Sequence, residues 1–261
     1  MDLKIQREGN FEFVEEGEGP VLLLLHGLFG ALSNWKGVLN NYSKNYKVVI
    51  PLMPIYEMPL RESNVGGLSD FIQRFIEFKG YEQVNLLGNS LGGHVALVYA
   101  LEHPEKVSSM VLTGSSGLYE NTMGGSFPRR NSYDFIKSKV EYTFYEPDVA
   151  SKELVDEVYN IVNDRQKSIR IISMAKSSIR HNLKQEIKKI DVPVCLIWGN
   201  NDSITPPHVA DEFYRLMPHS EVHYIDKCGH APMMEKPEDF NQTLEAFLNK
   251  VIKSPNPQNA C

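Results

Sequence analysis

Residues 84–97 read VNLLGNSLGGHVAL, and this stretch decides the fold. A short apolar run of strand length, 84–87, leads directly into Gly-Asn-Ser-Leu-Gly, and an apolar pattern of helical period follows from Leu91 to Leu101. In a sharp turn from strand to helix, small flanking residues let the serine adopt a strained backbone that lifts its hydroxyl above the sheet. The helix N-terminus behind the turn favours developing negative charge. The pattern predicts that Ser90 is a nucleophile; a plain glycine-rich turn before a helix is the alternative interpretation.

Apolar runs of strand length recur on both sides of this turn, separated by segments of helical period. The predicted strands are 21–25, 47–50, 84–87, 107–113, 194–198 and 222–225, and the predicted helices are 69–79, 91–101, 209–216 and 240–252. Strands that alternate with helices indicate an α/β class protein with a mostly parallel twisted sheet and helices on both faces. Residues 4–7 and 11–15 are predicted to form a hairpin at the sheet edge.

The alternation stops after Thr113 and restarts at 191–193. The segment between is far longer than an ordinary connection, and its period is helical from Ser151 onward. We therefore predict a helical cap, or lid, at 117–185, between two parts of the core at 1–116 and 186–253, with a flexible tail at 254–261. Its aromatic residues are expected to line an apolar site or to form the core of the cap: Phe127, Tyr133, Tyr142, Phe144 and Tyr145.

Composition excludes several classes of function. The chain has 261 residues, 42% of them hydrophobic, and its formal net charge of −6 disfavours nucleic acid as a partner. Three cysteines without paired spacing give no disulfide framework and no zinc motif, so no metal is expected. The N-terminus has no signal-peptide pattern, and no apolar run is long enough for a membrane span, so no membrane partner is expected. We expect a cytoplasmic protein; the sequence does not determine its oligomeric state.

A second glycine-containing turn, HGLFG at 26–30, follows the strongest predicted strand. Preorganised backbone N–H groups at such a turn stabilise the oxyanion of acyl transfer, by about 3 kcal/mol each. The predicted donors are the N–H groups of Leu28 and Leu91, with Phe29 as a neighbouring possibility. For His26 a catalytic role is the alternative, and a structural role that ties down the loop by hydrogen bonds is preferred. The predicted pocket residues are His26, Phe29, Asn89, Phe127, Tyr133 and Met233.

The base and its acid partner are predicted from their positions after two late strands. His230 closes the loop 226–230 after the last strand, and Asp202 closes the turn 199–202 after the strand before it. Asp226 is a competitor for the acid, but it lies in the same loop as the histidine. No carboxylate follows the strand that ends at Thr113 until Glu120, which favours Asp202.

At this point the sequence resembles the α/β-hydrolase family. The resemblance rests on His26-Gly27, the stretch 88–93, the stretch 198–202 and Gly229-His230, and it spans about residues 20–250. It implies the α/β-hydrolase fold with a Ser-Asp-His chain order, a catalytic triad of Ser90, Asp202 and His230, an acyl-enzyme, and no cofactor. Further stretches at 30–35, 114–118 and 228–230 look like the meta-cleavage-product C–C hydrolases, which cut a vinylogous diketone.

Two departures separate this chain from those C–C hydrolases. The family pattern Asp-x-Pro-Gly-x-Gly-x-Ser is replaced here by Pro-Leu-Met-Pro-Ile-Tyr at 51–56. The cap arginine that binds the substrate carboxylate falls on Val158; Arg129, Arg130 or Arg165 could substitute, or could be solvated surface residues.

From the resemblance and the two departures we rank three predicted functions. The first prediction is a carboxylic-ester hydrolase acting on a small or medium apolar substrate with a carbonyl. A C–C hydrolase of dienoate diketones is the second. A non-enzymatic receptor for a small ligand is the third. A serine at position 90 disfavours aspartate-nucleophile dehalogenases and epoxide hydrolases.

Overall fold

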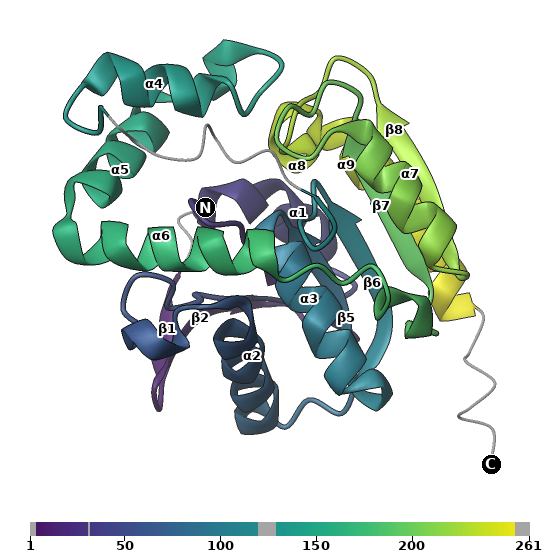
Figure 1. Cartoon of the computed structure of the whole chain (residues 1–261). Coiled ribbons are helices and arrows are strands. Elements are labelled where there is room, and N and C mark those ends of the chain that lie inside the picture. Colours follow the sequence, from purple (N-terminus) through teal and green to yellow (C-terminus); the bar gives the residue numbers. More distant parts are fainter. Residues whose placement is uncertain (1–3, 31, 120–128, 254–261) are drawn as a thin grey trace.

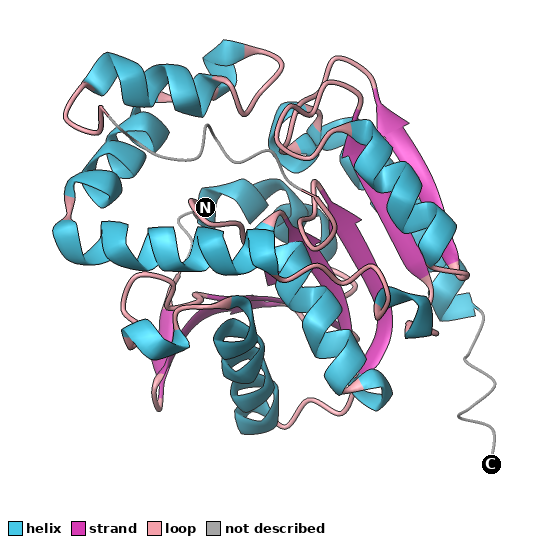
Figure 2. Ribbon diagram, viewed as in Figure 1, coloured by secondary structure: helices cyan, strands magenta, loops and turns pink. Residues whose placement is uncertain are grey.

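A computed structural model describes residues 4–30, 32–119 and 129–253. Its centre is an eight-stranded sheet in the order β1-β2-β4-β3-β5-β6-β7-β8, with helices on both faces (Figures 1 and 2). Only the pairs β1–β2 and β2–β4 are antiparallel; every other neighbouring pair is parallel. The predicted fold class, an α/β-hydrolase-type mostly parallel sheet, is confirmed.

The strands agree closely with the apolar runs in the sequence. Their bounds are β1 Gln6–Glu8, β2 Phe11–Glu16, β3 Val21–Leu25, β4 Lys47–Pro51, β5 Val84–Asn89, β6 Val107–Thr113, β7 Val194–Gly199 and β8 Ser220–Ile225. The central strands β3 and β5 are apolar on both faces because helices cover both sides. The edge strand β8 has exposed residues, so its hydrophobic pattern is weaker and its first two residues were not predicted.

Alternate residues of each strand point to opposite faces and build two hydrophobic cores. Leu23 and Leu25 of β3 belong to the core under α2 (Val65–Lys79), α3 (Leu91–Glu102) and α7 (Pro207–Leu216). Leu22 and Leu24 belong to the core under α1 (Lys36–Tyr42) and α9 (Pro237–Lys253). The short helix α1 was not predicted, since its seven residues, KGVLNNY, carry little apolar periodicity.

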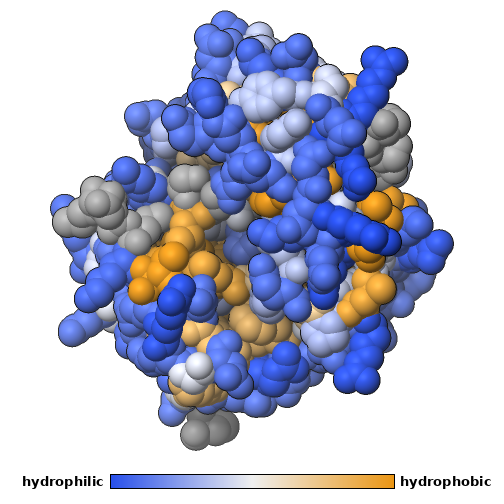
Figure 3. Space-filling model, turned by 90° about the vertical axis from the view of Figure 1, so that its left-hand side faces the viewer, coloured by the Kyte–Doolittle hydropathy of each residue, from blue (hydrophilic) through white to orange (hydrophobic). Residues whose placement is uncertain are grey.

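Three α-helices lie in the described part of the connection between β6 and β7: α4 (Tyr133–Glu141), α5 (Lys152–Asn163) and α6 (Arg165–Arg180). Each begins at a side-chain cap, provided by Ser132, Ser151 and Asp164 respectively. In Figure 1 they form a separate group beside the sheet, at the end where β5 enters α3. On the side of the molecule shown in Figure 3, a mostly blue face carries several orange hydrophobic areas, the most extensive of them left of centre.

The short helix α8 (Pro232–Glu235) directly precedes α9. Among the described residues, no helix combines the length and apolarity that crossing a membrane requires. The predicted tail at 254–261 lies outside the described residues.

Candidate active site

Ser90 occupies the turn between β5 and α3. Its φ of 55° and ψ of −120° lie in a region that residues with a side chain rarely adopt. The chain passes so close to itself here that a Cβ on Gly88 would lie 2.6 Å from the carbonyl oxygen of Gly92. A Cβ on Gly92 would lie 2.0 Å from the carbonyl oxygen of Leu25. Only glycine fits at these two positions, so the sequence Gly-x-Ser-x-Gly is a steric requirement of the turn.

His230 and Asp202 are in direct contact. The Nδ1 atom of His230 lies 2.9 Å from Oδ2 of Asp202, and both side chains are buried. The two residues are 28 positions apart in the chain and meet because the parallel strands β7 and β8 end at the same sheet edge. A carboxylate at Nδ1 fixes the tautomer and leaves Nε2 as the acceptor nitrogen.

The carboxylate of Asp202 is itself held in place by three donors. Its Oδ1 accepts the backbone N–H groups of Ile204 and Thr205 at 2.8 and 2.9 Å, and its Oδ2 accepts the Thr205 hydroxyl at 2.8 Å. The competitor Asp226 is instead bonded to the side chain of Asn200 on the surface. The structure thus supports the choice of Asp202 over Asp226 as partner of the histidine.

A cavity of about 650 Å³ contains both Ser90 and His230 in its wall, together with Leu28 and Leu91. Nine further wall residues are apolar and come from α4, α5 and α6. These apolar wall residues are Val140, Leu154, Val158, Val162, Ile171, Ile172, Met174, Ala175 and Ile179. The cavity therefore has a polar end at the sheet edge and an apolar end made by the inserted helices.

The backbone N–H groups of Leu28 and Leu91 make no hydrogen bond to any other described residue. Their loop is held from the other side instead. The Tyr56 hydroxyl donates to the carbonyl oxygen of Leu28 at 2.6 Å, and the Met53 N–H donates to His26 Nε2 at 3.2 Å. The unusual segment 51–56 thus supports the loop that carries the predicted oxyanion donor.

The predicted pocket residues divide into two groups. Phe29 and Asn89 line the cavity; the amide of Asn89 also donates to the carbonyl oxygens of Thr113 and His230, at 3.0 and 3.1 Å. His26, Tyr133 and Met233 do not line it, which corrects the prediction. Phe127 lies outside the described residues.

Each of the three corrected residues has another role. His26 is tied to its own loop, and burial lowers its pKa. The Tyr133 hydroxyl donates to Asp156 inside the insert. Met233 packs in the core while the next residue, Met234, faces the cavity. The two methionines are neighbours in the short helix α8, and their apolar character alone does not indicate which of them faces the cavity.

Sequence reasoning missed the aliphatic wall from α5 and α6 and left Arg130 undecided. Val158 does line the cavity, in the position where a cap arginine was sought. Arg130 also lines it, with Nη1 3.5 Å from Ser168 Oγ. Of the predicted cap aromatics, Phe144 lines the cavity, whereas Tyr142 and Tyr145 are exposed.

A buried polar network lies behind the nucleophile turn, on the side of α3. The Nδ1 atom of His94 lies 3.3 Å from Ser178 Oγ and 3.4 Å from Ser116 Oγ, and its Nε2 lies 3.2 Å from His181 Nδ1. Burial, followed by the neighbouring His181, lowers the pKa of His94 to about 3. This network joins α3 to α6, and its member Ser178 also lines the cavity.

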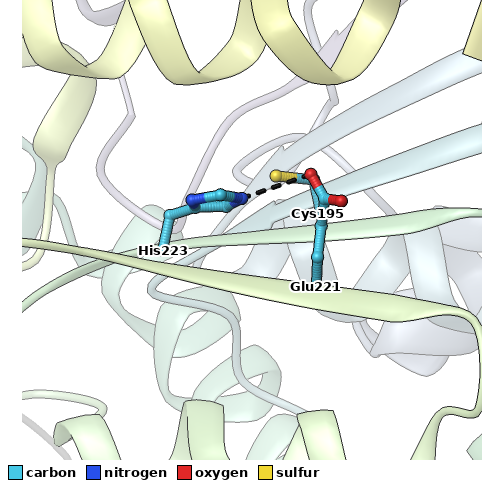
Figure 4. A group of neighbouring side chains, drawn as sticks. All are labelled: Cys195, Glu221 and His223. Carbon is cyan, nitrogen blue, oxygen red and sulfur yellow. Dashed lines mark hydrogen bonds and ion pairs between the residues drawn. The ribbon is translucent and has the colours of Figure 1, made fainter. Parts of the chain in front are cut away.

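Three possible metal ligands come together elsewhere, on β7 and β8: Cys195, Glu221 and His223 (Figure 4). Their ligand atoms lie within 4.8 Å of one another, a proximity that the sequence did not reveal. The Glu221 carboxylate is already paired with Lys250 at 2.6 Å and with His223 at 3.2 Å. Burial raises the pKa of the Cys195 thiol, which disfavours the thiolate that a metal requires. None of the three lines the cavity of Ser90.

Comparison with known proteins identifies the family. The family model described as "alpha/beta hydrolase fold" matches residues 20–237. The chain belongs to the α/β hydrolase family. An α/β hydrolase from the metagenome of sediments of the Mar Chica lagoon, Morocco, is 44% identical, covers 95% of this chain and 98% of its own, and superposes with a TM-score of 0.79.

Two curated relatives of this α/β hydrolase carry different activities in their names. Human monoacylglycerol lipase ABHD6 is 29% identical over 92% of this chain and 78% of its own length. The 2-hydroxy-6-oxo-6-(2'-aminophenyl)hexa-2,4-dienoic acid hydrolase of Metapseudomonas resinovorans is 28% identical over 91% of this chain and 87% of its own. The α/β hydrolase described here is therefore an enzyme with both monoacylglycerol lipase and dienoic acid hydrolase relatives.

Proposed function

We propose that this α/β hydrolase cleaves carboxylic esters of small or medium apolar acyl groups through a Ser90–His230–Asp202 triad. The observation that carries the proposal is the shared cavity. Ser90, the Asp202-bound His230 and two backbone N–H groups without a partner among the described residues all lie at one end of it. The inserted helices α4–α6 act as a cap whose aliphatic wall holds the acyl chain.

The first chemical step is the attack of the serine on the ester carbonyl. His230 Nε2 takes the hydroxyl proton while Oγ of Ser90 forms a bond to the carbonyl carbon, and Asp202 stabilises the imidazolium through Nδ1. The negative charge moves to the carbonyl oxygen, where the N–H groups of Leu28 and Leu91 stabilise it. Each such donor contributes about 3 kcal/mol.

Collapse of this intermediate returns the proton from His230 to the leaving alcohol and leaves an acyl group on Ser90. A water molecule, deprotonated by the same imidazole, then attacks the acyl-enzyme. The second tetrahedral intermediate releases the carboxylic acid, and the proton returns to Ser90. All groups that these steps need are side chains or amides of this chain.

Ester cleavage is favoured over the cleavage of a dienoate diketone because the cavity wall is mainly aliphatic and Val158 stands where an arginine was sought. Arg130 in the wall is the observation that keeps the C–C hydrolase as a second candidate. A receptor without catalysis would not need the buried, three-donor environment of Asp202.

The test is a parallel assay of p-nitrophenyl butyrate and one meta-cleavage diketone with the wild-type chain and Ser90→Ala. We expect the ester to be the better substrate and the variant to be inactive, with a fluorophosphonate labelling Ser90 in the wild type only. Ser108→Ala is the matched control, since its hydroxyl bonds to Gln83 on the surface. Undiminished activity of Ser90→Ala, or a strong preference for the diketone, would contradict the proposal.

A further inference from the structure

The outer face of α6 combines exposed aliphatic residues with cations. Ile169, Ile172 and Ile179 are 45%, 52% and 49% exposed, high values for isoleucine in a folded protein. Their spacing of three and seven residues places them on one face of the helix. In Figure 1, α6 runs across the front of the molecule with no other element in front of it.

The same helix is strongly basic. Its sixteen residues, RQKSIRIISMAKSSIR, contain five cations and no acid, although the whole chain has a net charge of −6. Arg165, Lys176 and Arg180 are exposed, and none of them forms a salt bridge with another described residue. At helical spacing these three lie on the same face as the isoleucines. We call this set of six residues the α6 outer face.

The α6 outer face continues into the proposed active site. Ile172, Lys176 and Ile179 are exposed and also line the 650 Å³ cavity that contains Ser90. The apolar surface of the α6 outer face is therefore continuous with the aliphatic wall of the cavity. A ligand that enters here need not expose its acyl chain to water between the two.

We infer that the α6 outer face docks this enzyme on an anionic lipid–water interface and that its ester substrate is an amphiphile drawn from that interface. Isoleucines that enter the acyl boundary and cations that meet phosphate headgroups are the two interactions that hold a basic amphipathic helix at such a surface. Because charges farther than about 8 Å are screened at physiological salt, the local basic face outweighs the acidic remainder of the chain. The amphiphilic substrate, but not the docking itself, depends on the ester hydrolysis proposed above.

The test uses the full chain with Ser90→Ala, so that binding is measured without turnover. We expect it to co-sediment with phosphatidylcholine vesicles that contain phosphatidylglycerol, and more weakly with phosphatidylcholine alone or at high salt. Arg165→Gln with Arg180→Gln should weaken binding about 25-fold, given about 1 kcal/mol for each cation. Ile169→Ser should weaken it about tenfold. None of these three residues lines the cavity.

Matched controls remove the same groups elsewhere on the surface. Lys36→Gln with Lys44→Gln deletes two exposed cations, and Ile5→Ser deletes an isoleucine that is 43% exposed. Both should leave vesicle binding unchanged. Absence of binding to anionic vesicles, or equal losses in the test and control variants, would overturn the inference. A concentration-dependent dimer that Ile169→Ser abolishes, without vesicle binding, would overturn it in favour of a second copy of the chain.

Hydrolysis of soluble p-nitrophenyl butyrate separates this inference from the proposed function. Activity in solution without vesicle binding would remove the docking surface and leave the ester hydrolase. Vesicle binding by a chain that hydrolyses no ester would support the docking surface and reject the substrate that we assign to it.

Discussion

The backbone N–H of His230 donates to the carbonyl oxygen of Thr143 at 2.9 Å, which joins the loop of the proposed base to the inserted helices. Glu235 reinforces the same junction. Its Oε1 accepts the N–H of Gly229 at 2.9 Å, and its Oε2 accepts the N–H of Tyr145 at 2.7 Å. The inserted helices and the loop of the proposed base are thus joined through backbone hydrogen bonds, so that a change at this junction is expected to affect catalysis without touching the substrate.

Glu235→Gln should destabilise the chain by about 1–3 kcal/mol, because one of the two backbone N–H groups then faces an amide donor. The loop of His230 loosens, so kcat should fall with little change in KM. Urea unfolding and ester kinetics measure the two effects. Glu18→Gln, at an exposed position, is the control and should change neither. A loss of stability with unchanged kcat would show that the junction does not position His230.

The strained backbone of Ser90 predicts opposite effects of two inactive variants. At a φ of 55° and a ψ of −120°, glycine is unstrained, whereas alanine keeps the strain. Ser90→Gly should therefore be more stable than Ser90→Ala by about 1 kcal/mol. At Ser43, where φ is −61°, the order should reverse, with alanine the more stable. Thermal unfolding of the four variants measures both differences in stability. If the alanine variant were the more stable one at both positions, the result would argue against backbone strain at Ser90.

Asp202→Asn should lower kcat about 10⁴-fold, since the amide nitrogen at the Oδ2 position would favour the wrong histidine tautomer. The backbone bonds to Oδ1 from Ile204 and Thr205 remain, so the fold should be retained. Asp226→Asn serves as the control and should stay within about twofold of the wild type, since its partner is Asn200. Equal losses of kcat in the two variants would contradict the assignment of Asp202 as the acid partner of His230.

Tyr56→Phe removes the hydroxyl that donates to the carbonyl oxygen of Leu28. We expect kcat to fall about tenfold with a smaller change in KM, because the neighbouring N–H acts on the transition state more than on the bound ester. Tyr214→Phe, at a half-exposed tyrosine, should have no effect. An increase in KM alone would mean that Tyr56 shapes the substrate site rather than the oxyanion donor.

Burial of His94 predicts a specific loss of stability in acid. Its pKa lies near 3 in the folded chain and at 6.5 in a solvated histidine, so the unfolded chain takes up the proton first. His94 therefore leaves stability unchanged above about pH 6.5 and costs about 1.4 kcal/mol for each pH unit from there down toward pH 3. His94→Gln should flatten the decline of unfolding free energy below pH 6.5, and the exposed His208→Gln should not. Parallel slopes in all three proteins would reject this origin.

Much of the core was predictable because its information is local. The run 21–25 is apolar without interruption, and the turn at 88–92 needs glycine on both sides of Ser90, so each is recorded in adjacent residues. The helix α1 and the first two residues of β8 escaped prediction because α1 has few apolar residues and Ser220 and Glu221 are polar. Met233 was predicted in the pocket where Met234 lies, because a short helix can turn either neighbour inward, whereas the preferred loop-tying role of His26 agrees with its hydrogen bonds.

The sequence by itself determined the alternation of strands and helices, the strained serine turn and the candidate roles of Ser90, Asp202 and His230. Each depends on short-range steric rules and on the order of strand ends along the chain. Only the tertiary structure decided which aliphatic residues of α5 and α6 form the cavity wall, that Tyr56 supports Leu28, and that isoleucines and cations share one exposed helix face. Those relationships join residues that are remote in the chain, and their distances are fixed only when the layers pack together.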